Sequence, residues 1–270
     1  MNPYTKLTLL AAILALNTAC SPSNSNDSYT KHSEDSRTPT FTERDSSRHP
    51  NETLAFFEIK EDQSVVEIWP GGGWYAEILA PYLRPNGTYY AAHFDAQSSI
   101  KFFRGMRAKF NQKITSNPSV YDKTIITDFA PPHKVNVAPV ETADRVLTFR
   151  NVHNWMRSSS EQAAFNSFYN ALKPGGYLGV VEHRAPNSFT QKEMINSGYV
   201  SESYVKQLAK NSGFIFSGSS EVNSNPKDTK NHPKGVWTLP PSLRLGEKDQ
   251  EKYLSIGESD RMTLKFKKPN

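Results

Sequence analysis

Apolar runs and amphipathic stretches alternate along the chain from Arg48 onward. Short apolar runs predict seven strands, at residues 64–69, 88–94, 124–126, 143–149, 177–182, 214–220 and 261–266. Between them, apolar side chains at helical spacing predict helices over 48–57, 74–83, 100–110, 160–172 and 201–212. Strands that alternate with helices of about 10–15 residues are typical of βαβ units. We therefore expect an α/β domain with a mostly parallel seven-stranded sheet and helices on both faces.

The turn after the first strand is rich in glycine. Gly71, Gly72 and Gly73 link strand 64–69 to the next helix, and glycine lets a backbone take positive φ and approach a ligand closely. Because right-handed crossovers bring the loops after parallel strands to one edge of the sheet, we expect a ligand there. The GxGxxG spacing of dinucleotide-binding proteins is absent, which disfavours an NAD(P)-linked Rossmann enzyme.

The first 47 residues have a different character. Lys6 precedes an apolar run at 7–16 that is too short to span a membrane as a mature helix, and Ala19-Cys20 follows shortly after. This pattern predicts a secretory signal peptide over 1–19. Residues 21–47 are rich in Ser, Asn, Asp, Thr and Lys and have almost no apolar side chains, so we expect a disordered tether. The globular domain then covers 48–270.

Cys20 is the single cysteine of the chain, so no intramolecular disulfide can form. Its place directly after Ala19 resembles a bacterial lipobox, in which the cysteine is acylated and becomes the new N-terminus. The resemblance implies an exported protein of the cell envelope. With Ser21 next to the cysteine, the lipid anchor and tether over 20–47 would hold it on the outer membrane, facing the periplasm. The alternative is a chance cysteine beside an ordinary cleavage site.

The composition adds one exclusion. Hydrophobic residues make up 36% of the chain and charged residues 22%, as in ordinary soluble folds. The formal net charge is +5, but the positive side chains are scattered and are not gathered with aromatic residues. We therefore expect no nucleic-acid partner.

The segment Val65-Val66-Glu67-Ile68-Trp69-Pro70-Gly71-Gly72-Gly73-Trp74-Tyr75 resembles motif I of class I S-adenosylmethionine-dependent methyltransferases, Glu/Asp-x-Gly-x-Gly-x-Gly. Glu67, Gly71 and Gly73 match the motif, whereas Trp69 takes the place of its first glycine. Together with Gly235–Pro241, the segment is similar to a group of bacterial exported predicted methyltransferases. The resemblance implies a Rossmann-like class I methyltransferase fold that binds S-adenosyl-L-methionine and methylates a small-molecule acceptor.

The resemblance also implies a cofactor site at the strand ends. By register with the family, His93 takes the slot of a ribose-binding acid, with Asp95 two residues beyond it. Asp95 either reaches the ribose or only starts the next loop. Asp128 takes the slot that meets the adenine amino group, or is a solvated loop residue. The full set of implied cofactor-binding residues is Glu67, Trp69, Pro70, Gly71, Gly73, His93, Asp95, Asp128, Arg150 and Asn151.

The acceptor is expected beside the end of the fourth strand. His153 is the candidate catalytic base that would take a proton from the acceptor, or else a polar residue that starts a helix. Trp155, His183 and Trp237 would line the acceptor pocket, and His183 is a second candidate base. No metal site is expected.

The sequence leaves more than one function open. Methyl transfer to an unidentified acceptor is the first hypothesis. The second is a binding protein that kept the fold and lost the chemistry, because Trp69 replaces a motif glycine and an exported protein meets little S-adenosylmethionine. Fold alone does not decide between them. Binding of S-adenosylmethionine rather than NADH would separate both from an NAD(P)-linked enzyme.

Overall fold

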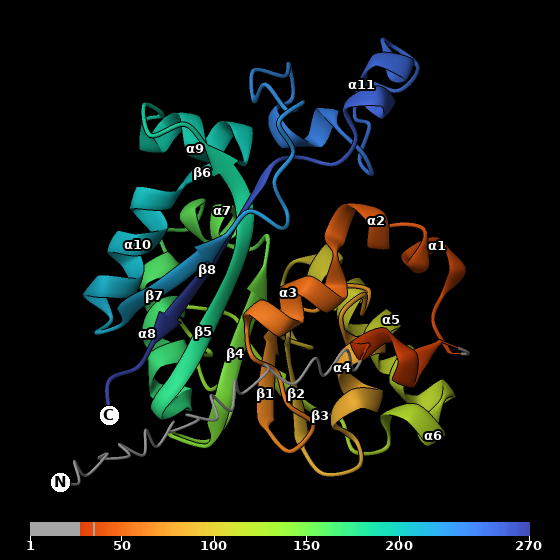
Figure 1. Ribbon diagram of the computed structural model, residues 1–270, viewed down its shortest axis with the longest axis vertical. Coiled ribbons are helices and arrows are strands. Elements are labelled where there is room, and N and C mark those ends of the chain that lie inside the picture. The colour runs from red at the N-terminus through yellow and green to blue at the C-terminus, as the bar shows by residue number, and fades with distance from the viewer. Residues whose placement is uncertain (1–27, 35) are drawn as a thin grey trace, which may run out of the picture.

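The computed structural model describes residues 28–34 and 36–270, and Figure 1 shows them around one sheet. The strands follow the order β3-β2-β1-β4-β5-β8-β7. The five strands from β3 to β5 are parallel, and β8 lies antiparallel between β5 and β7. The mostly parallel sheet predicted from the sequence is confirmed, with the short β6 added beside β5. The strands are β1 (Ser64–Ile68), β2 (Thr88–His93), β3 (Ile125–Asp128), β4 (Ala143–Phe149), β5 (Leu172–Ala185), β6 (Val200–Ser201), β7 (Ile215–Ser220) and β8 (Arg261–Lys267).

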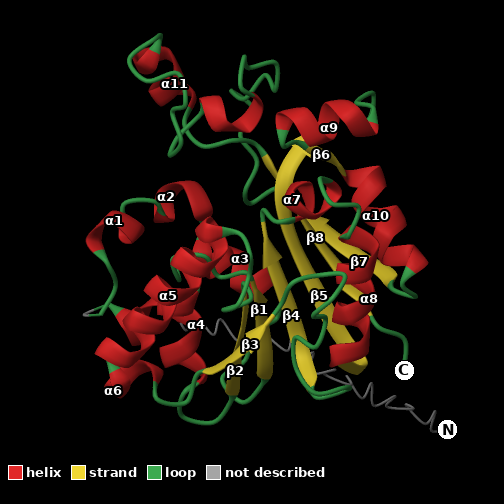
Figure 2. Ribbon diagram, turned by 180° about the vertical axis from the view of Figure 1, so that it is seen from behind, coloured by secondary structure: helices red, strands yellow, loops and turns green. Residues whose placement is uncertain are grey.

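Helices cover both faces of the sheet, as Figure 2 shows. Successive residues of a strand point to opposite faces, so Val65 and Val66 of β1 belong to two separate hydrophobic cores. One core lies under α3 (Pro50–Phe56), α4 (Ala76–Leu83), α5 (Lys101–Ser116) and α6 (Pro118–Tyr121). The other lies under α7 (Val152–Met156), α8 (Glu161–Ala171) and α10 (Glu202–Asn211). Near-continuous apolar strands are what burial on both faces requires.

Some elements differ from those predicted. α5 continues to Ser116, beyond the predicted end at residue 110, and β5 begins at Leu172, where a helix was expected to end. Short elements also lie in segments that were predicted as loops: α9 (Gln191–Ser197), η2 (Gly235–Thr238) and α11 (Gln250–Ile256), besides α6, α7 and β6. A helix of one or two turns has too few apolar positions to show a helical period.

Residues 28–34 and 36–47 pack against the domain, contrary to the expected tether. They form η1 (Tyr29–Ser33), α1 (Pro39–Thr42) and α2 (Asp45–Arg48), and η1 packs on α4. Thr38 donates from its backbone N and its hydroxyl to the carboxylate of Glu77, at 2.9 and 2.6 Å. Trp74 Nε1 donates to the carbonyl of Phe41 at 2.9 Å. The polar composition was misleading because hydrogen bonds and ion pairs to the domain hold this segment in place.

The predicted signal peptide and the predicted lipid anchor at Cys20 fall within residues 1–27, outside the described part of the chain. Among the residues that are described, no helix has both the length and the apolar character needed to cross a membrane.

Candidate functional site

The glycine turn lies where β1 ends, at the carboxyl edge of the sheet. Ile68 is in register with Ala92 of β2 and Thr148 of β4, so the turn starts between two strand ends. Trp69, Gly71 and Gly73 all have positive φ, at 48°, 60° and 88°. A side chain at Gly71 would meet no atom within 4 Å, so the backbone there faces open space. The turn therefore leaves room for a ligand at Gly71.

Trp69 forms a wall of an aromatic cleft beside this turn. Its indole N–H donates to the carbonyl of Phe129 at 2.9 Å, and its ring centroid lies 4.6 Å from that of Phe94. The cleft has a volume of about 630 Å³, within the range of about 300–1,000 Å³ that is usual for small-molecule sites. Asp95 and Asn154 are among its lining residues, so it spans the loops after β2, β3 and β4. We call it the aromatic cleft.

His93 and Glu67, which were expected to contact the cofactor, are both buried near the end of β1. His93 Nε2 bonds the carbonyl of Gly71 at 3.0 Å, while its Nδ1 accepts from the backbone N of Phe94 at 2.7 Å. Burial lowers the pKa of His93 to about 4, so the ring is neutral and its two nitrogens are occupied. Glu67 is also buried and accepts from Tyr89 Oη at 2.6 Å. Both side chains are therefore hydrogen-bonded within the protein, and their contacts with a cofactor stay a prediction.

The two aspartates lie near the aromatic cleft but are paired with cations. Asp95 accepts from Lys134 Nζ at 2.7 Å, and this hydrogen bond holds the pKa of Asp95 below its ordinary value. Asp128 accepts from Arg107 Nη1 at 2.6 Å and from Lys134 Nζ at 3.3 Å. Asp95 lines the cleft, whereas Asp128 does not.

The turn after β4 separates the aromatic cleft from a second cleft. Asn154 lines the aromatic cleft, while Arg150 and His153 line the second one. Asn151 is buried and donates to the carbonyl of Ile68 at 2.9 Å, so it joins two strand ends. Trp155, expected in the acceptor pocket, lies in the core with 1% of its surface exposed. Asn151, the N-cap of α7, and Trp155 within α7 are both buried. Their positions in the sequence did not reveal this burial.

The second cleft has a volume of about 240 Å³ and brings together four of the predicted residues, Arg150, His153, His183 and Trp237. It also contains residues that sequence reasoning missed. Arg44 and Arg48 come from the N-terminal segment, and Glu258 comes from the loop before β8. We call it the arginine cleft. Its walls derive from five separate segments of the chain.

His153 and Glu182 form a buried pair at the arginine cleft. His153 Nδ1 lies 3.0 Å from Glu182 Oε1, and the same carboxylate accepts from the backbone N of Val152 at 2.7 Å and of His183 at 2.8 Å. In the tautomer that donates from Nδ1 to Glu182, Nε2 is an acceptor, and it has no hydrogen-bond partner among the described residues. This is the orientation of a general base.

His183 is a weaker candidate base. Burial and the neighbouring His153 lower its pKa well below the ordinary value, and its Nδ1 bonds Ser259 Oγ at 2.5 Å. The ligand atoms of His153, Glu182 and His183 lie within 4.8 Å of one another, a spacing that could hold a metal ion. The adjacent guanidinium of Arg150 disfavours a cation there.

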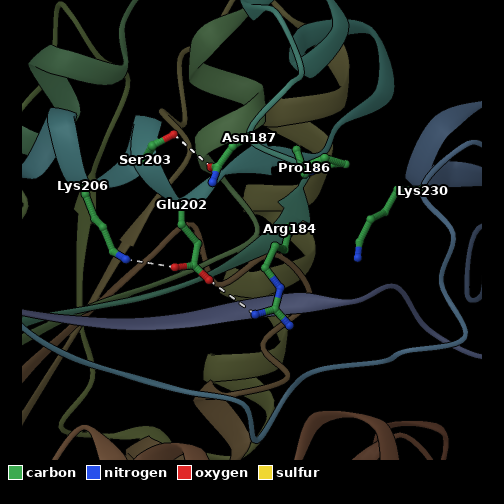
Figure 3. Close-up of a pocket in the computed structure, with 8 residues that line it drawn as sticks. Arg184, Pro186, Asn187, Glu202, Ser203, Lys206 and Lys230 are labelled. Carbon is green, nitrogen blue, oxygen red and sulfur yellow. Dashed lines mark hydrogen bonds and ion pairs between the residues drawn. The ribbon is translucent and has the colours of Figure 1, made fainter.

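A third cleft, of about 520 Å³, lies between the end of β5, helix α10 and Lys230 (Figure 3). Its charges are matched. Arg184 pairs with Glu202, Glu221 and Asp260, and Lys206 pairs with Glu202. Because it carries none of the predicted residues and its cations already have partners, we do not regard it as the active site.

No family model matches the chain, and no curated protein matches its sequence. Among solved structures, it is similar to a SAM dependent methyltransferase from Aquifex aeolicus, with a TM-score of 0.55, 16% identity, and coverage of 89% of this chain and 98% of the other. It is also similar to the [4+2]-cyclase SpnF, with a TM-score of 0.54, 15% identity, and coverage of 83% of this chain and 80% of the other. A possible exported protein from Bordetella parapertussis is similar with a TM-score of 0.51, 11% identity, and coverage of 87% of this chain and 71% of the other. These likenesses show the Rossmann-like methyltransferase fold.

Proposed function

We propose that this chain transfers the methyl group of S-adenosylmethionine to a small-molecule acceptor. The observation that carries the proposal is the pair of clefts on either side of the turn after β4. One is aromatic and the other contains a positioned histidine. The carboxyl edge of an open α/β sheet is the usual place for a ligand, and both clefts open there.

The residues of the aromatic cleft fit an adenosyl group. Trp69 and Phe94 offer aromatic faces, and Asp95 offers a carboxylate that could accept from ribose hydroxyls. The open space at Gly71 fits a backbone that a ligand approaches closely. When bound, the cofactor supplies an electrophilic methyl group on a sulfonium, and an aromatic face close to such a cation is stabilising.

His153 is the residue we propose as the base. It lines the arginine cleft, and Glu182 holds the ring by its Nδ1 at 3.0 Å. An acceptor hydroxyl or amine must lose a proton as its lone pair attacks, and Nε2 would accept that proton. Glu182 is a positioning residue, because it contacts the ring and not the acceptor. The residues that line the two clefts would orient the acceptor toward the methyl group.

The second candidate function is binding without methyl transfer. The observation that favours it is Trp69, whose ring fills the space next to the turn and contacts Phe94, Phe103 and Trp155, with centroids 4.6, 5.7 and 5.5 Å away. The [4+2]-cyclase among the similar structures illustrates that this fold supports other chemistry.

Calorimetry on the full chain in mild detergent tests the proposal. We expect S-adenosylmethionine and S-adenosylhomocysteine to bind at one site and NADH not to bind. Absence of heat with both S-adenosyl compounds would refute methyl transfer. Binding without turnover over a broad set of acceptors would favour the second function.

We also propose that the chain is exported and carries a lipid on Cys20, as an outer-membrane lipoprotein that faces the periplasm. The similarity to an exported protein of the same fold supports export, and the pattern around Ala19-Cys20 supports the anchor. Two or three acyl chains hold a protein on a membrane durably, because each buried CH₂ contributes about 0.8 kcal/mol. In cell fractionation, Cys20→Ser should release the protein from the membrane. Equal membrane retention and processing of Cys20→Ser would contradict the anchor.

A further inference from the structure

The arginine cleft gathers more positive than negative charge. Arg44 Nε donates to Glu258 Oε1 at 2.7 Å, Arg261 Nη1 donates to Glu258 Oε2 at 3.1 Å, and Arg48 Nε lies 3.6 Å from the same oxygen. The guanidinium of Arg150 forms no hydrogen bond or ion pair with the side chains of the described residues. Three guanidinium groups thus share the carboxylate of Glu258, and the fourth, that of Arg150, has no carboxylate partner among the described residues.

The positive groups are buried as well as crowded. Arg48 is 4% exposed and Arg261 is 2% exposed, and the Nε atom of each is buried without a hydrogen-bond partner. Burial and the charge of Arg150 lower the pKa of Arg48, and burial lowers that of Arg261 to about 10. Although burial alone would raise the pKa of Glu258, Arg261 and Arg48 hold it at about 2. Buried charge with too few partners is costly, so a further anion would stabilise this arrangement.

The third cleft differs from the arginine cleft in its charge balance. In Figure 3, Arg184 and Lys206 face Glu202 directly. Lys230 at the edge of that cleft pairs with Asp260 at 2.8 Å. Its cations are thus matched by carboxylates of the protein itself, and nothing there requires an external anion.

We propose that the arginine cleft binds an oxyanion group of the methyl acceptor, a carboxylate or a phosphate, through Arg150, Arg48 and Arg44. The proposal rests on methyl transfer as the function. Guanidinium groups bind carboxylates and phosphates in a planar, bidentate geometry. S-adenosylmethionine itself has a sulfonium, an ammonium and a single carboxylate, so as a net cation it is repelled by this cleft, whereas an anionic acceptor is attracted.

The same cleft restricts the rest of the acceptor. Its volume of about 240 Å³ admits a group of a few heavy atoms, and His153 lines it beside Arg150. A carboxylate held by guanidinium groups donates its electron density to them and is a weak nucleophile, so the oxyanion serves as an anchor. The reacting atom is then a hydroxyl or amine close to the anchor, whose proton His153 accepts. Small hydroxy acids, amino acids and phosphate esters have this layout.

The test uses two probes, glycolate and inorganic phosphate, titrated calorimetrically into the full chain at constant ionic strength with chloride as the reference ion. We expect at least one probe to bind, and Arg150→Gln to weaken it about tenfold or more, because a charge-assisted hydrogen bond is lost. Arg84→Gln is the charge-matched control, since Arg84 pairs with Asp122 on the surface. It should leave the affinity unchanged.

A second measurement distinguishes a binding arginine from a structural one. Because Arg150 has no side-chain partner and is repelled by its neighbours, Arg150→Gln in chloride buffer should melt no lower than the wild type. Its affinity for S-adenosylmethionine should stay within about threefold. Equal probe affinities of wild type and Arg150→Gln would overturn the proposal, as would an equal loss of S-adenosylmethionine affinity. Probe binding without any S-adenosylmethionine binding would support the oxyanion site and refute methyl transfer, so the two proposals fail separately.

Discussion

The carboxyl group of Glu67 should make the stability of this fold depend on pH near neutrality. Glu67 lies on β1 with 3% of its surface exposed, and its hydrogen-bond donor is Tyr89 Oη. Burial raises its pKa from 4.5 to about 7, against the opposing effect of that hydrogen bond. Between these two values the folded chain keeps a proton that the unfolded chain has lost. Stability therefore falls as pH rises through this window and is constant above it.

The size of the effect follows from the shift. At about 1.4 kcal/mol per pKa unit, a rise from 4.5 to about 7 corresponds to about 3 kcal/mol of stability lost between pH 4.5 and pH 8. Glutamine resembles the protonated acid in shape and does not titrate. Relative to wild type, Glu67→Gln should therefore gain about 2.5 kcal/mol more at pH 8 than at pH 5, measured by urea unfolding.

Tyr89→Phe provides a matched control. It removes the hydroxyl that stabilises the ionised carboxylate, so it should shift the stability loss to higher pH. The double variant Glu67→Gln/Tyr89→Phe should lack the pH-dependent loss. If the stability difference between wild type and Glu67→Gln were the same at pH 5 and pH 8, Glu67 would titrate normally, and the burial argument would be wrong.

Three further predictions concern the turn, the base and the N-terminal segment. Gly71→Val should abolish S-adenosylmethionine binding in calorimetry. The control Gly246→Val changes a glycine with the same φ of 60° and equally open surroundings, and it should retain binding. Equal affinities of the two variants would show that the cofactor does not bind at Gly71. Glu182→Gln places an amide against backbone N–H donors and should cost about 2–3 kcal/mol in urea unfolding, and a loss below about 0.5 kcal/mol would show that the carboxylate is not needed. Phe41→Ala should lower the free energy of unfolding by about 1–2 kcal/mol, because the ring is partly buried against Gly72. The control Phe102→Ala should be nearly neutral, because Phe102 is 63% exposed. Similar losses for the two variants would contradict the packing of Phe41 on the domain.

The sequence predicted the fold because its periodicities are local. The strand from Ser64 to Ile68 and the helix from Glu202 to Asn211 each contain their own signal, an apolar run and an amphipathic face, and the structure places both within a residue or two of the prediction. The N-terminal segment has no such signal. Its order depends on partners such as Glu77 and Trp74, which lie far away in the sequence.

The candidate site was predictable in part. Position after β4 was enough to bring Arg150 and His153 to one cleft with His183 and Trp237. It was not enough to give the direction of each side chain, so Trp155 proved to be a core residue. Arg44 was missed because residues 21–47 were expected to form a tether, and Arg48 because its position predicted only the start of the first helix of the domain. Their i, i+4 spacing places both on one side of a helix, and this was the available signal.

The two candidate functions differ in what Trp69 does. Its backbone takes φ of 48°, a conformation that costs a side-chain-bearing residue about 1–2 kcal/mol, and its N–H bond to Phe129 fixes the ring. The first glycine of the motif takes this conformation without strain. A tryptophan at the same position is strained, so we expect its side chain to do more than fill space. The strain is balanced by a ring held at the mouth of a cleft that keeps about 630 Å³ free. A ring that leaves this volume open acts as a wall and not as a plug. An anion held in the arginine cleft, as we propose, would lie beside His153, because His153 lines the same cleft.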